Sequence, residues 1–417
     1  MAPLNASDGS RPPTVAILPW GDVIEDFLEP LGFKARDYLD QADGGWLFGY
    51  ATALQRASWR PVIVWASRDV TRPERLTHPA TGTAVWLVPG RSRVITRWNA
   101  RTSVRRWLAA PVAALTEVLR RERCRAIITQ EYEDPRFDQV VRIGRRWGIP
   151  VYASFQGGDR SGSWLEEMVR RRSIGASAGL IIPSASERAR VIACYAASLP
   201  PITDIPNPID LDAWQPIARA DARQQLGIAD DTFLVVNHGR IDIARKGLDV
   251  LVEAWATLSG RPGMQLVMIG SGQDDKSFAR LLDERKPAAL DWRRGYDTDR
   301  TRLRTWLSAA DIYVSASRLE GMPVAPLEAM ACGLPVVATD AKGLSDIIAG
   351  EEAHGGTLVP RDDPAALAAG IARLHADPGL RRRLSHAARK RVEDGYSLPA
   401  VSRALGALLD APERRSA

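Results

Sequence analysis

The chain has 417 residues, of which 45% are hydrophobic and 25% charged, with 33 Gly, 28 Pro and only three Cys. These values are typical of a globular protein of two or three domains. They exclude a disordered chain, a collagen-like repeat and a small disulfide scaffold. No apolar run approaches the roughly 20 residues of a membrane span, and residues 1–13 lack the basic start and apolar stretch of a secretory signal. We therefore expect an enzyme of a reducing compartment, the cytoplasm.

The surplus of positive charge lies in the first half of a chain whose net charge is +6, since residues 1–205 contain 28 basic and 21 acidic residues. Residues 91–125 contain ten Arg and only two acidic residues. Apolar residues in this segment recur at the spacing of one helix face, namely Val104, Trp107, Leu108, Pro111, Val112, Leu115, Val118 and Leu119. A basic helix with Trp at its boundary suits the surface of an anionic membrane. The alternatives are that the stripe packs against its own domain and that the Arg residues reflect codon usage.

Short apolar runs alternate with helical patterns along the first 200 residues. We expect strands at 14–20, 60–67, 83–89, 126–130, 150–155 and 179–184, and helices that include 50–58 and 140–148. Strands that alternate with helices predict right-handed crossovers and a doubly wound parallel sheet.

The second half repeats this alternation after a segment rich in Pro and Asp, 202–214, which has the composition of an interdomain connection. Strands are expected at 232–239, 264–270, 311–317 and 334–339, and helices at 248–258, 300–309, 364–392 and 399–411. Two open α/β domains result. Such folds bind ligands at the carboxyl ends of their strands, here in a cleft between the domains.

The segment 315–340, SASRLEGMPVAPLEAMACGLPVVATD, is the most informative stretch of the chain. A strand is followed by a loop with Glu320, a short helix with Glu328, and a helix stop at Gly333. The rest of the loop consists of Gly321, Met322 and Pro323. Carboxylates accept hydrogen bonds strongly from hydroxyl groups, and the N-terminus of a helix suits phosphate. The pattern indicates a polyhydroxylated, phosphorylated ligand.

A second group of charged residues follows the strand expected at 232–239. Gly239 and Arg240 lie at its carboxyl end, and Lys246 comes six residues after Arg240, just before a helix. Arg and Lys in these places are suited to hold a diphosphate from two sides. Gly44 and Gly45 precede another helix and allow the backbone to approach a phosphate, although a plain turn explains them equally well.

Together these residues resemble the retaining nucleotide-sugar glycosyltransferases of family 4. The resemblance implies the GT-B type of α/β fold, with two Rossmann-like domains facing a central cleft. It further implies that Glu320 contacts the donor sugar and Glu328 the nucleotide ribose. Arg240 and Lys246 match the diphosphate-binding pair, so Arg240, Lys246 and Glu320 are the expected catalytic residues. Gly45 matches the glycine loop of the first domain.

Three features depart from this family. Gln156 stands where many members have a His, so it is expected to contact a sugar hydroxyl rather than to act as a base. The segment 22–42 is additional and is expected to shape the acceptor site. Asp346 replaces a Glu of the family.

The resemblance implies transfer of a hexose-type sugar from a UDP- or GDP-sugar, with retention of configuration and without a metal or other cofactor. The expected acceptor is a glycan or a lipid-linked molecule of cell-envelope or exopolysaccharide synthesis. Such an enzyme would act in the cytoplasm or at the inner face of the membrane. The expected domains are 1–205 for the acceptor, 206–395 for the donor, and a returning helix within 396–417.

Other functions remain as alternatives. A nucleotide-sugar epimerase of the same shape would not release free nucleotide on addition of an acceptor, which distinguishes it from a transferase. Two Asp-x-Asp patterns, 210–212 and 297–299, match a metal motif that is common by chance, and Asp299 also suits a helix cap. No ribbon of alternating Arg and aromatic residues indicates nucleic acid as a partner.

Overall fold

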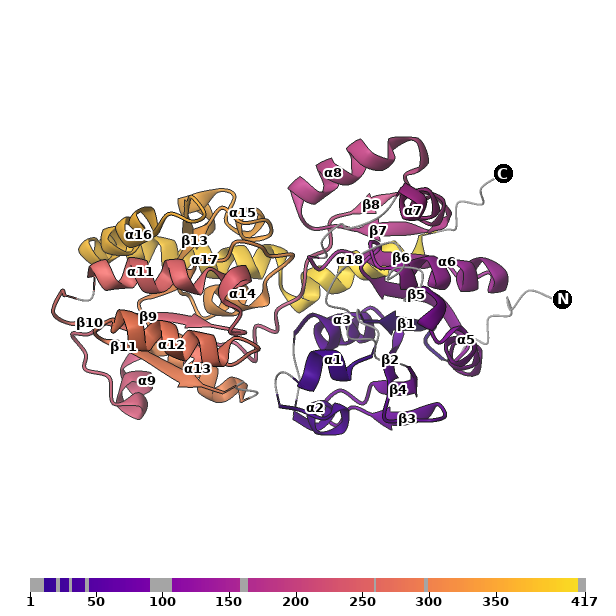
Figure 1. Ribbon diagram of the computed structural model, residues 1–417, viewed down its shortest axis with the longest axis horizontal. Coiled ribbons are helices and arrows are strands. Elements are labelled where there is room, and N and C mark those ends of the chain that lie inside the picture. Colours follow the sequence, from indigo (N-terminus) through magenta and orange to yellow (C-terminus); the bar gives the residue numbers. More distant parts are fainter. Residues whose placement is uncertain are drawn as a thin grey trace. The chain divides into compact units, whose positions relative to one another are not determined.

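The computed structural model describes residues 11–19, 23–29, 32–41, 45–90, 107–157, 164–258, 260–295 and 299–411. The chain divides into two compact units, one of Met1–Pro206 with Val401–Ala417 and the other of Asn207–Ala400. The division after Pro206 lies one residue beyond the domain boundary predicted at residue 205. Both units combine helices with a parallel or mostly parallel sheet, which confirms the predicted α/β class (Figure 1).

The first unit contains an eight-stranded sheet in the order β3-β4-β2-β1-β5-β6-β7-β8. Its strands are β1 (Thr14–Leu18), β2 (Arg60–Ser67), β3 (Glu74–Thr77), β4 (Ala84–Pro89), β5 (Cys124–Gln130), β6 (Val151–Ser154), β7 (Gly179–Ile181) and β8 (Ile202–Thr203). Its helices are α1 (Glu25–Leu28), α2 (Ala35–Gln41), α3 (Gly45–Arg56), α5 (Val112–Arg121), α6 (Pro135–Trp147), α7 (Trp164–Ala176), α8 (Ala185–Tyr195) and a 3-10 helix (Ala196–Ser198). Among the described strands of this sheet, only β3 pairs antiparallel, with β4.

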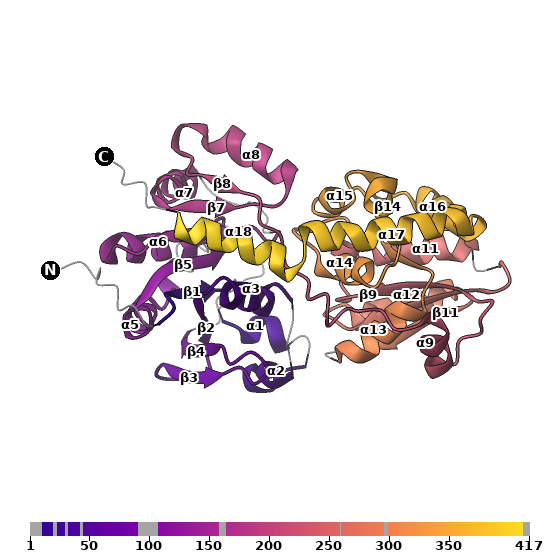
Figure 2. The ribbon, with the colours of Figure 1, turned by 180° about the vertical axis from the view of Figure 1, so that it is seen from behind.

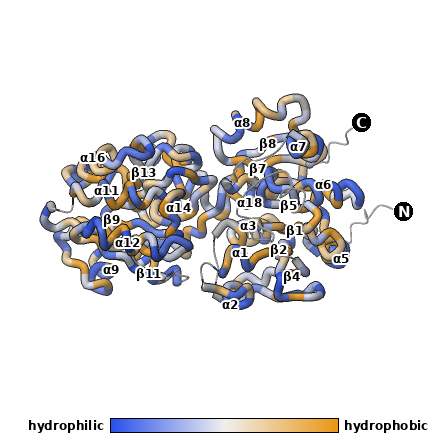
Figure 3. Tube along the Cα trace, in the orientation of Figure 1, coloured by the Kyte–Doolittle hydropathy of each residue, from blue (hydrophilic) through white to orange (hydrophobic). Residues whose placement is uncertain are grey.

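The central strands of this unit form because their side chains are apolar on both faces, as in a sheet covered by helices on each side. All five residues of β1 and seven of the eight in β2 are buried. Figure 3 shows hydrophobic residues along such strands, whereas surface helices such as α12 (Asp275–Arg285) of the other unit are largely hydrophilic. Helix α6 has clear end signals, since the Asp134 side chain caps its first turn and Gly148 ends it in the left-handed conformation.

Helix α5 shows which residues of the apolar stripe predicted within 91–125 are buried in the first unit, as far as this segment is described. Leu115, Val118 and Leu119 are buried in the core of the first unit. Leu108, by contrast, is 67% exposed. The predicted membrane-facing stripe is therefore wrong for α5, because burial against the domain's own sheet removes this face from any other surface. Val104 and the Arg residues at positions 97, 101, 105 and 106 lie outside the described residues.

The second unit contains a six-stranded parallel sheet in the order β11-β10-β9-β12-β13-β14. Its strands are β9 (Phe233–His238), β10 (Met264–Gly270), β11 (Leu290–Arg294), β12 (Ile312–Ser315), β13 (Val336–Thr339) and β14 (Gly356–Val359). Its helices are α9 (Arg219–Leu226), α10 (Ile243–Lys246), α11 (Leu248–Leu258), α12 (Asp275–Arg285), α13 (Arg300–Ala309), α14 (Val324–Ala331), α15 (Leu344–Ile347), a 3-10 helix (Glu351–His354), α16 (Pro364–Ala376) and α17 (Pro378–Gly395).

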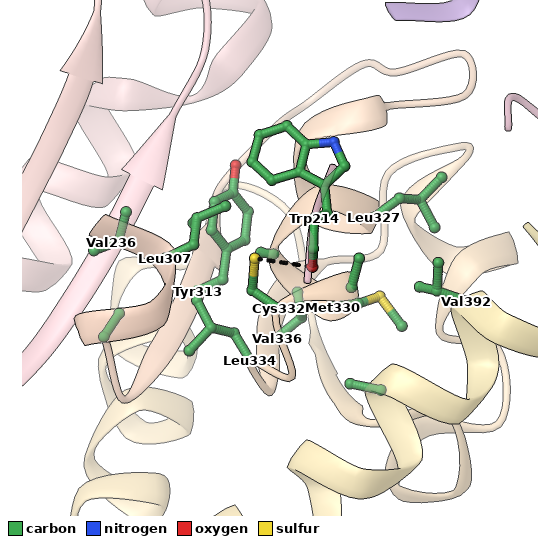
Figure 4. Close-up of a cluster of buried hydrophobic side chains, with 14 of the residues drawn as sticks. Trp214, Val236, Leu307, Tyr313, Leu327, Met330, Cys332, Leu334, Val336 and Val392 are labelled. Atoms are coloured by element: carbon green, nitrogen blue, oxygen red, sulfur yellow. Dashed lines mark hydrogen bonds between the residues drawn. The ribbon is translucent and has the colours of Figure 1, made fainter. Parts of the chain in front are cut away.

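Alternate residues of β9 enter two separate cores, so both faces of this sheet are buried. Leu234 and Val236 pack with α13, α14 and α17, whereas Phe233 and Val235 pack with α11, α12 and α16. Figure 4 shows the first of these cores, where Trp214 lies beside Leu327 and Met330 of α14 and the Cys332 thiol contacts the Trp214 carbonyl oxygen. Trp214 belongs to the segment predicted as a connection, which thus ends as part of this core.

The C-terminal helices differ in detail from the prediction. The helix expected at 364–392 is two helices, α16 and α17, because Asp377 caps a new first turn that starts at Pro378. Helix α18 (Leu398–Asp410) follows, and its residues from Val401 onward belong to the first unit. There the Trp59 indole donates to Asp410 and the Tyr152 hydroxyl to the Leu408 carbonyl oxygen. Figure 2 shows this helix near α3. Among the described residues, no helix has the length and apolar character to span a membrane.

Candidate functional site

The strand order of the second unit reverses between β9 and β12. Numbered along the chain, its strands lie in the order 3-2-1-4-5-6, so the crossovers leave β9 and β12 toward opposite edges of the sheet. The carboxyl ends of the two strands on either side of such a reversal are the usual ligand site of a doubly wound sheet. Here β9 ends at His238 and is followed by Gly239 and Arg240, whereas β12 leads to Ser317 and Glu320.

Lys246 is placed at this edge by the short helix α10. The Asp242 side chain caps the helix, and Gly247 ends it with φ of 59°. A Cβ atom at Gly247 would lie 2.0 Å from the Ala316 carbonyl oxygen, so only Gly allows the helix end to approach β12 this closely. The approach brings the ammonium group of Lys246 to the loop that carries Glu320.

Glu320 is buried and receives two hydrogen bonds on the same oxygen. Lys246 Nζ donates to Glu320 Oε1 at 2.5 Å, and Ser317 Oγ donates to the same atom at 2.7 Å. The Glu320 side chain is 8% exposed and that of Lys246 26%. Two of the three residues predicted to be catalytic are therefore in direct contact.

Arg318 ties α10 to the Glu320 loop and was not identified from the sequence. Its guanidinium donates to both carboxylate oxygens of Asp249 at 2.8 Å and to the carbonyl oxygens of Ile243 and Ala244. The bond to Asp249 raises the pKa of Arg318, although burial opposes this effect. A bidentate pair of this kind fixes orientation as well as charge. Arg318 thus holds the backbone next to Lys246 in place.

Glu328 comes from the second turn of α14 and contacts the end of β9. Its Oε2 atom lies 2.9 Å from His238 Nε2. The side chains of Glu328 and His238 are 14% and 7% exposed. Glu328 and Glu320 therefore have different partners, one a ring nitrogen and the other an ammonium group.

The loop between the two carboxylates is fixed by its backbone. Asn207, which is 1% exposed, donates from Nδ2 to the Met322 carbonyl oxygen at 2.9 Å. A Cβ atom at Gly343 would lie 2.2 Å from the Gly321 carbonyl oxygen. Pro323 precedes α14 and gives it no side-chain cap. The first N–H groups of this helix are therefore not engaged by the capping side chain and can meet an anion.

These groups surround a small pocket of about 20 Å³, which can hold a water molecule or one atom group of a ligand. It is lined by Asn237, His238, Gly239, Arg240, Lys246, Leu248, Tyr313, Ser315, Ser317, Glu320, Ala325 and Pro326. Four of the predicted site residues are among them. Gly321, Met322, Pro323 and Glu328 lie in the adjoining loop and helix.

Gln156, one of the residues predicted in the first unit, lies just beyond the end of a strand. It follows β6 and is half-buried, and its backbone N–H donates to Glu131 Oε1 at 2.7 Å. Glu131 directly follows β5 and has φ of 62°, a strained conformation for a residue other than Gly. Glu131 was not identified from the sequence, where its only signal is its place after an apolar strand. Gly45 begins α3, and Gly44 lies outside the described residues.

The two Asp-x-Asp patterns serve local structure where they are described. Asp210 accepts from the backbone N–H groups of Asp212 and Ala213. Asp299 caps α13 by accepting from Thr301 and Arg302, as expected for a helix start. Asp297 lies outside the described residues. Over the described parts of the chain, no group of three or more His, Cys, Asp or Glu residues is placed to hold a metal ion.

Residues 218–391, which include all eight site residues predicted in the second unit, match the family model "Glycosyl transferases group 1". The match confirms the predicted enzyme class, a glycosyltransferase, for these residues.

Known proteins resemble the chain at two levels. In sequence, it is 32% identical over 230 residues to a D-inositol 3-phosphate glycosyltransferase of Xylanimonas cellulosilytica, covering 52% of this chain and 53% of the relative. The chain thus spans about half the length of this curated relative. In structure, the sucrose-phosphate synthase of Thermosynechococcus elongatus has a TM-score of 0.74 at 22% identity, covering 95% and 98% of the two chains. The Anabaena protein HepE, solved in complex with UDP-glucose, has a TM-score of 0.69 at 16% identity, covering 96% and 100%. These structures show the fold.

Proposed function

We propose that the chain transfers a hexose-type sugar from a UDP- or GDP-sugar to a hydroxyl group of a glycan or lipid-linked acceptor. The observation that carries this proposal is the pocket at the ends of β9 and β12, which combines Arg240 and Lys246 with the carboxylate of Glu320. Glu328 lies in the neighbouring helix. Two cationic groups and two carboxylates match the two chemical parts of a nucleotide sugar, its diphosphate and its hydroxyl groups.

The cationic groups stabilise the leaving diphosphate. Arg240 and Lys246 line the pocket, and the uncapped first turn of α14 lies beside it. Preorganised positive charge of this kind stabilises negative charge that develops in a transition state. Lys246 has three N–H donors, so it can keep Glu320 and still donate to a phosphate oxygen. No step of this scheme requires a metal, and we expect activity to persist in EDTA.

The carboxylates orient the ligand. Glu320 uses Oε1 for Lys246 and Ser317, and Glu328 uses Oε2 for His238. Each carboxylate has a second oxygen with which to accept from sugar or ribose hydroxyls. We assign Glu320 to the donor sugar and Glu328 to the ribose, and we expect the product to retain the anomeric configuration of the donor.

The name of the Xylanimonas relative and the UDP-glucose bound to HepE support a nucleotide-sugar donor and a hydroxylated acceptor. We assign the acceptor to the first unit, where Gln156 and Glu131 follow neighbouring strands. Synthesis of an envelope or extracellular polysaccharide is the corresponding process.

The test is a donor screen. The purified chain is incubated with UDP-, GDP- and ADP-hexoses, with and without a panel of glycan and lipid-linked acceptors, while free nucleotide is measured. Nucleotide release that requires an acceptor supports transfer, and NMR of the product gives its anomeric configuration. Conversion of the donor sugar without any nucleotide release would instead favour a nucleotide-sugar epimerase.

A further inference from the structure

His238 occupies a fixed position at the end of the central strand β9. Its ring lies edge-on to the ring of Tyr313, with centroids 5.4 Å apart, and Nε2 contacts Glu328 Oε2. The Tyr313 hydroxyl donates to the His238 carbonyl oxygen at 3.1 Å. Burial raises the pKa of Tyr313, so this hydroxyl stays protonated and remains a donor. Ring and backbone of His238 are thus held from two sides.

The two ring nitrogens of His238 have different surroundings. A carboxylate only accepts hydrogen bonds, so the contact with Glu328 places a proton on Nε2. With a single ring proton, on Nε2, the other nitrogen, Nδ1, is an acceptor. Nδ1 is buried and has no hydrogen-bond partner among the described residues, although His238 lines the pocket beside Arg240, Lys246 and Glu320.

An unpartnered buried acceptor is unfavourable, and a ligand group that donates to it removes this penalty. Phosphate oxygens cannot do so at neutral pH, because they are acceptors themselves. A hydroxyl group can donate a hydrogen bond to Nδ1. A purely structural His would need only Nε2, since the bond to Glu328 already fixes the ring.

We propose that His238 is a ligand-binding residue of the donor site. Through Nε2 it positions Glu328, and through Nδ1 it accepts a hydrogen bond from a hydroxyl group of the bound nucleotide sugar. This inference rests on the proposed function and extends it, because it adds a neutral acceptor to the two carboxylates that bind hydroxyl groups. The pocket then distinguishes ligands by a hydroxyl group at one position.

Two substitutions separate the roles of the two nitrogens. His238→Gln places an amide near the position of Nε2 and can still donate to Glu328, but it loses the acceptor at Nδ1. His238→Asn places an amide near Nδ1 and loses the contact with Glu328. His386→Gln is the control, since His386 is an exposed His on α17. Binding of UDP, GDP and ADP, and of the corresponding nucleotide glucoses, is measured by calorimetry, and melting temperatures check folding.

We expect His238→Gln to weaken binding by about tenfold, the equivalent of one lost hydrogen bond, while His386→Gln binds normally. A loss with the nucleotide alone assigns the hydroxyl to the ribose, and a loss confined to the nucleotide sugar assigns it to the sugar. His238→Asn should also weaken binding, through Glu328. Normal affinity of folded His238→Gln for all ligands would overturn the role of Nδ1. If His238→Gln does not fold, affinity of His238→Asn equal to that of wild type would overturn the positioning role.

Failure of the proposed function gives a different result. In that case the wild-type chain binds none of the nucleotides or nucleotide sugars, and the inference falls together with the donor site. Nucleotide binding by wild type that is unchanged in both His238 variants leaves the donor site in place and removes only His238.

Discussion

Lys246 Nζ and Glu320 Oε1 lie 2.5 Å apart, although their residues are 74 positions apart in the sequence. The pair joins the group proposed to hold the diphosphate to the group proposed to hold the sugar. Its two side chains come from α10 and from the loop after β12, which meet where Gly247 contacts Ala316. A change at either residue therefore affects the other, and variants have to be compared by what they bind as well as by their rate.

The first prediction concerns Arg240 and Lys246, the two residues proposed to hold the diphosphate. Lys246→Ala and Arg240→Ala should each reduce turnover by roughly 100- to 1,000-fold, as expected when one preorganised electrostatic group is removed. Arg240→Lys should also be poor, because Lys lacks the planar fork of guanidinium. Lys390→Ala is the control, since Lys390 pairs with Asp394 on the exposed side of α17. Initial rates of acceptor-dependent nucleotide release measure the effect. Near-normal turnover in Lys246→Ala would remove Lys246 from the mechanism.

The two carboxylates give the second prediction. Glu328→Gln keeps the shape of the side chain but loses its charge, and should weaken binding of the free nucleotide by about 1.5–3 kcal/mol. Glu320→Gln should leave nucleotide affinity near normal and reduce turnover, because its contact is with the sugar. Calorimetry with the nucleotide alone separates the two variants. Equal losses of nucleotide affinity would contradict the assignment.

Local pattern was sufficient to predict most of the described strands and several of the helices. Strands β2 and β10 and helices α11 and α13 have the predicted bounds, because apolar runs and helix caps act over a few residues. The prediction missed four strands, β3, β8, β11 and β14. All lie at or near sheet edges, where polar residues such as those of LDWRR in β11 weaken the apolar signal.

Local sequence patterns could not predict contacts between residues that are distant in the sequence. The sequence placed Arg240, Lys246 and Glu320 at strand ends, but their meeting depends on β9 lying next to β12. The same holds for His238 with Glu328 and for Arg318 with Asp249, which pair 90 and 69 positions apart. The strand order had to be known before any of these pairs could be predicted.

The third prediction compares two glycines that end helices of the second unit in the left-handed conformation. Gly227 has φ of 69°, and a Cβ atom added there would have no atom within 4 Å, whereas a Cβ atom at Gly247 would meet the Ala316 carbonyl oxygen. Gly227→Ala should cost only about 1–2 kcal/mol, from conformation alone. Gly247→Ala should cost more than about 3 kcal/mol and weaken nucleotide binding, because backbone must move away from the site.

Urea unfolding of both Gly variants, together with nucleotide calorimetry, tests this difference. The Gly227 variant serves as the matched control for loss of the left-handed preference. Equal stability of the two variants, with intact binding in both, would show that the close approach of α10 to β12 does not position Lys246.

The fourth prediction concerns Asp138, a buried carboxyl group of α6 in the first unit. Burial raises its pKa to about 6, although Arg170 at 3.3 Å favours the charged form. The folded chain therefore binds a proton more tightly at this group than the unfolded chain, whose Asp residues have an ordinary pKa near 4. The stability that the protonated group contributes is fully present below about pH 4 and is lost as the pH rises through about 6.

Asp138→Asn should remove this dependence, because the amide does not titrate. Between pH 4 and pH 8, we expect the free energy of unfolding of the wild-type first unit to fall relative to that of Asp138→Asn, by on the order of 3 kcal/mol at most. Urea unfolding at several pH values measures the difference, with Asp69→Asn as the control at an exposed Asp. The difference between the curves isolates Asp138, because all other titrating groups are common to both proteins. Parallel curves for wild type and Asp138→Asn would show that Arg170 compensates fully for burial and that the pKa of Asp138 is not raised on folding.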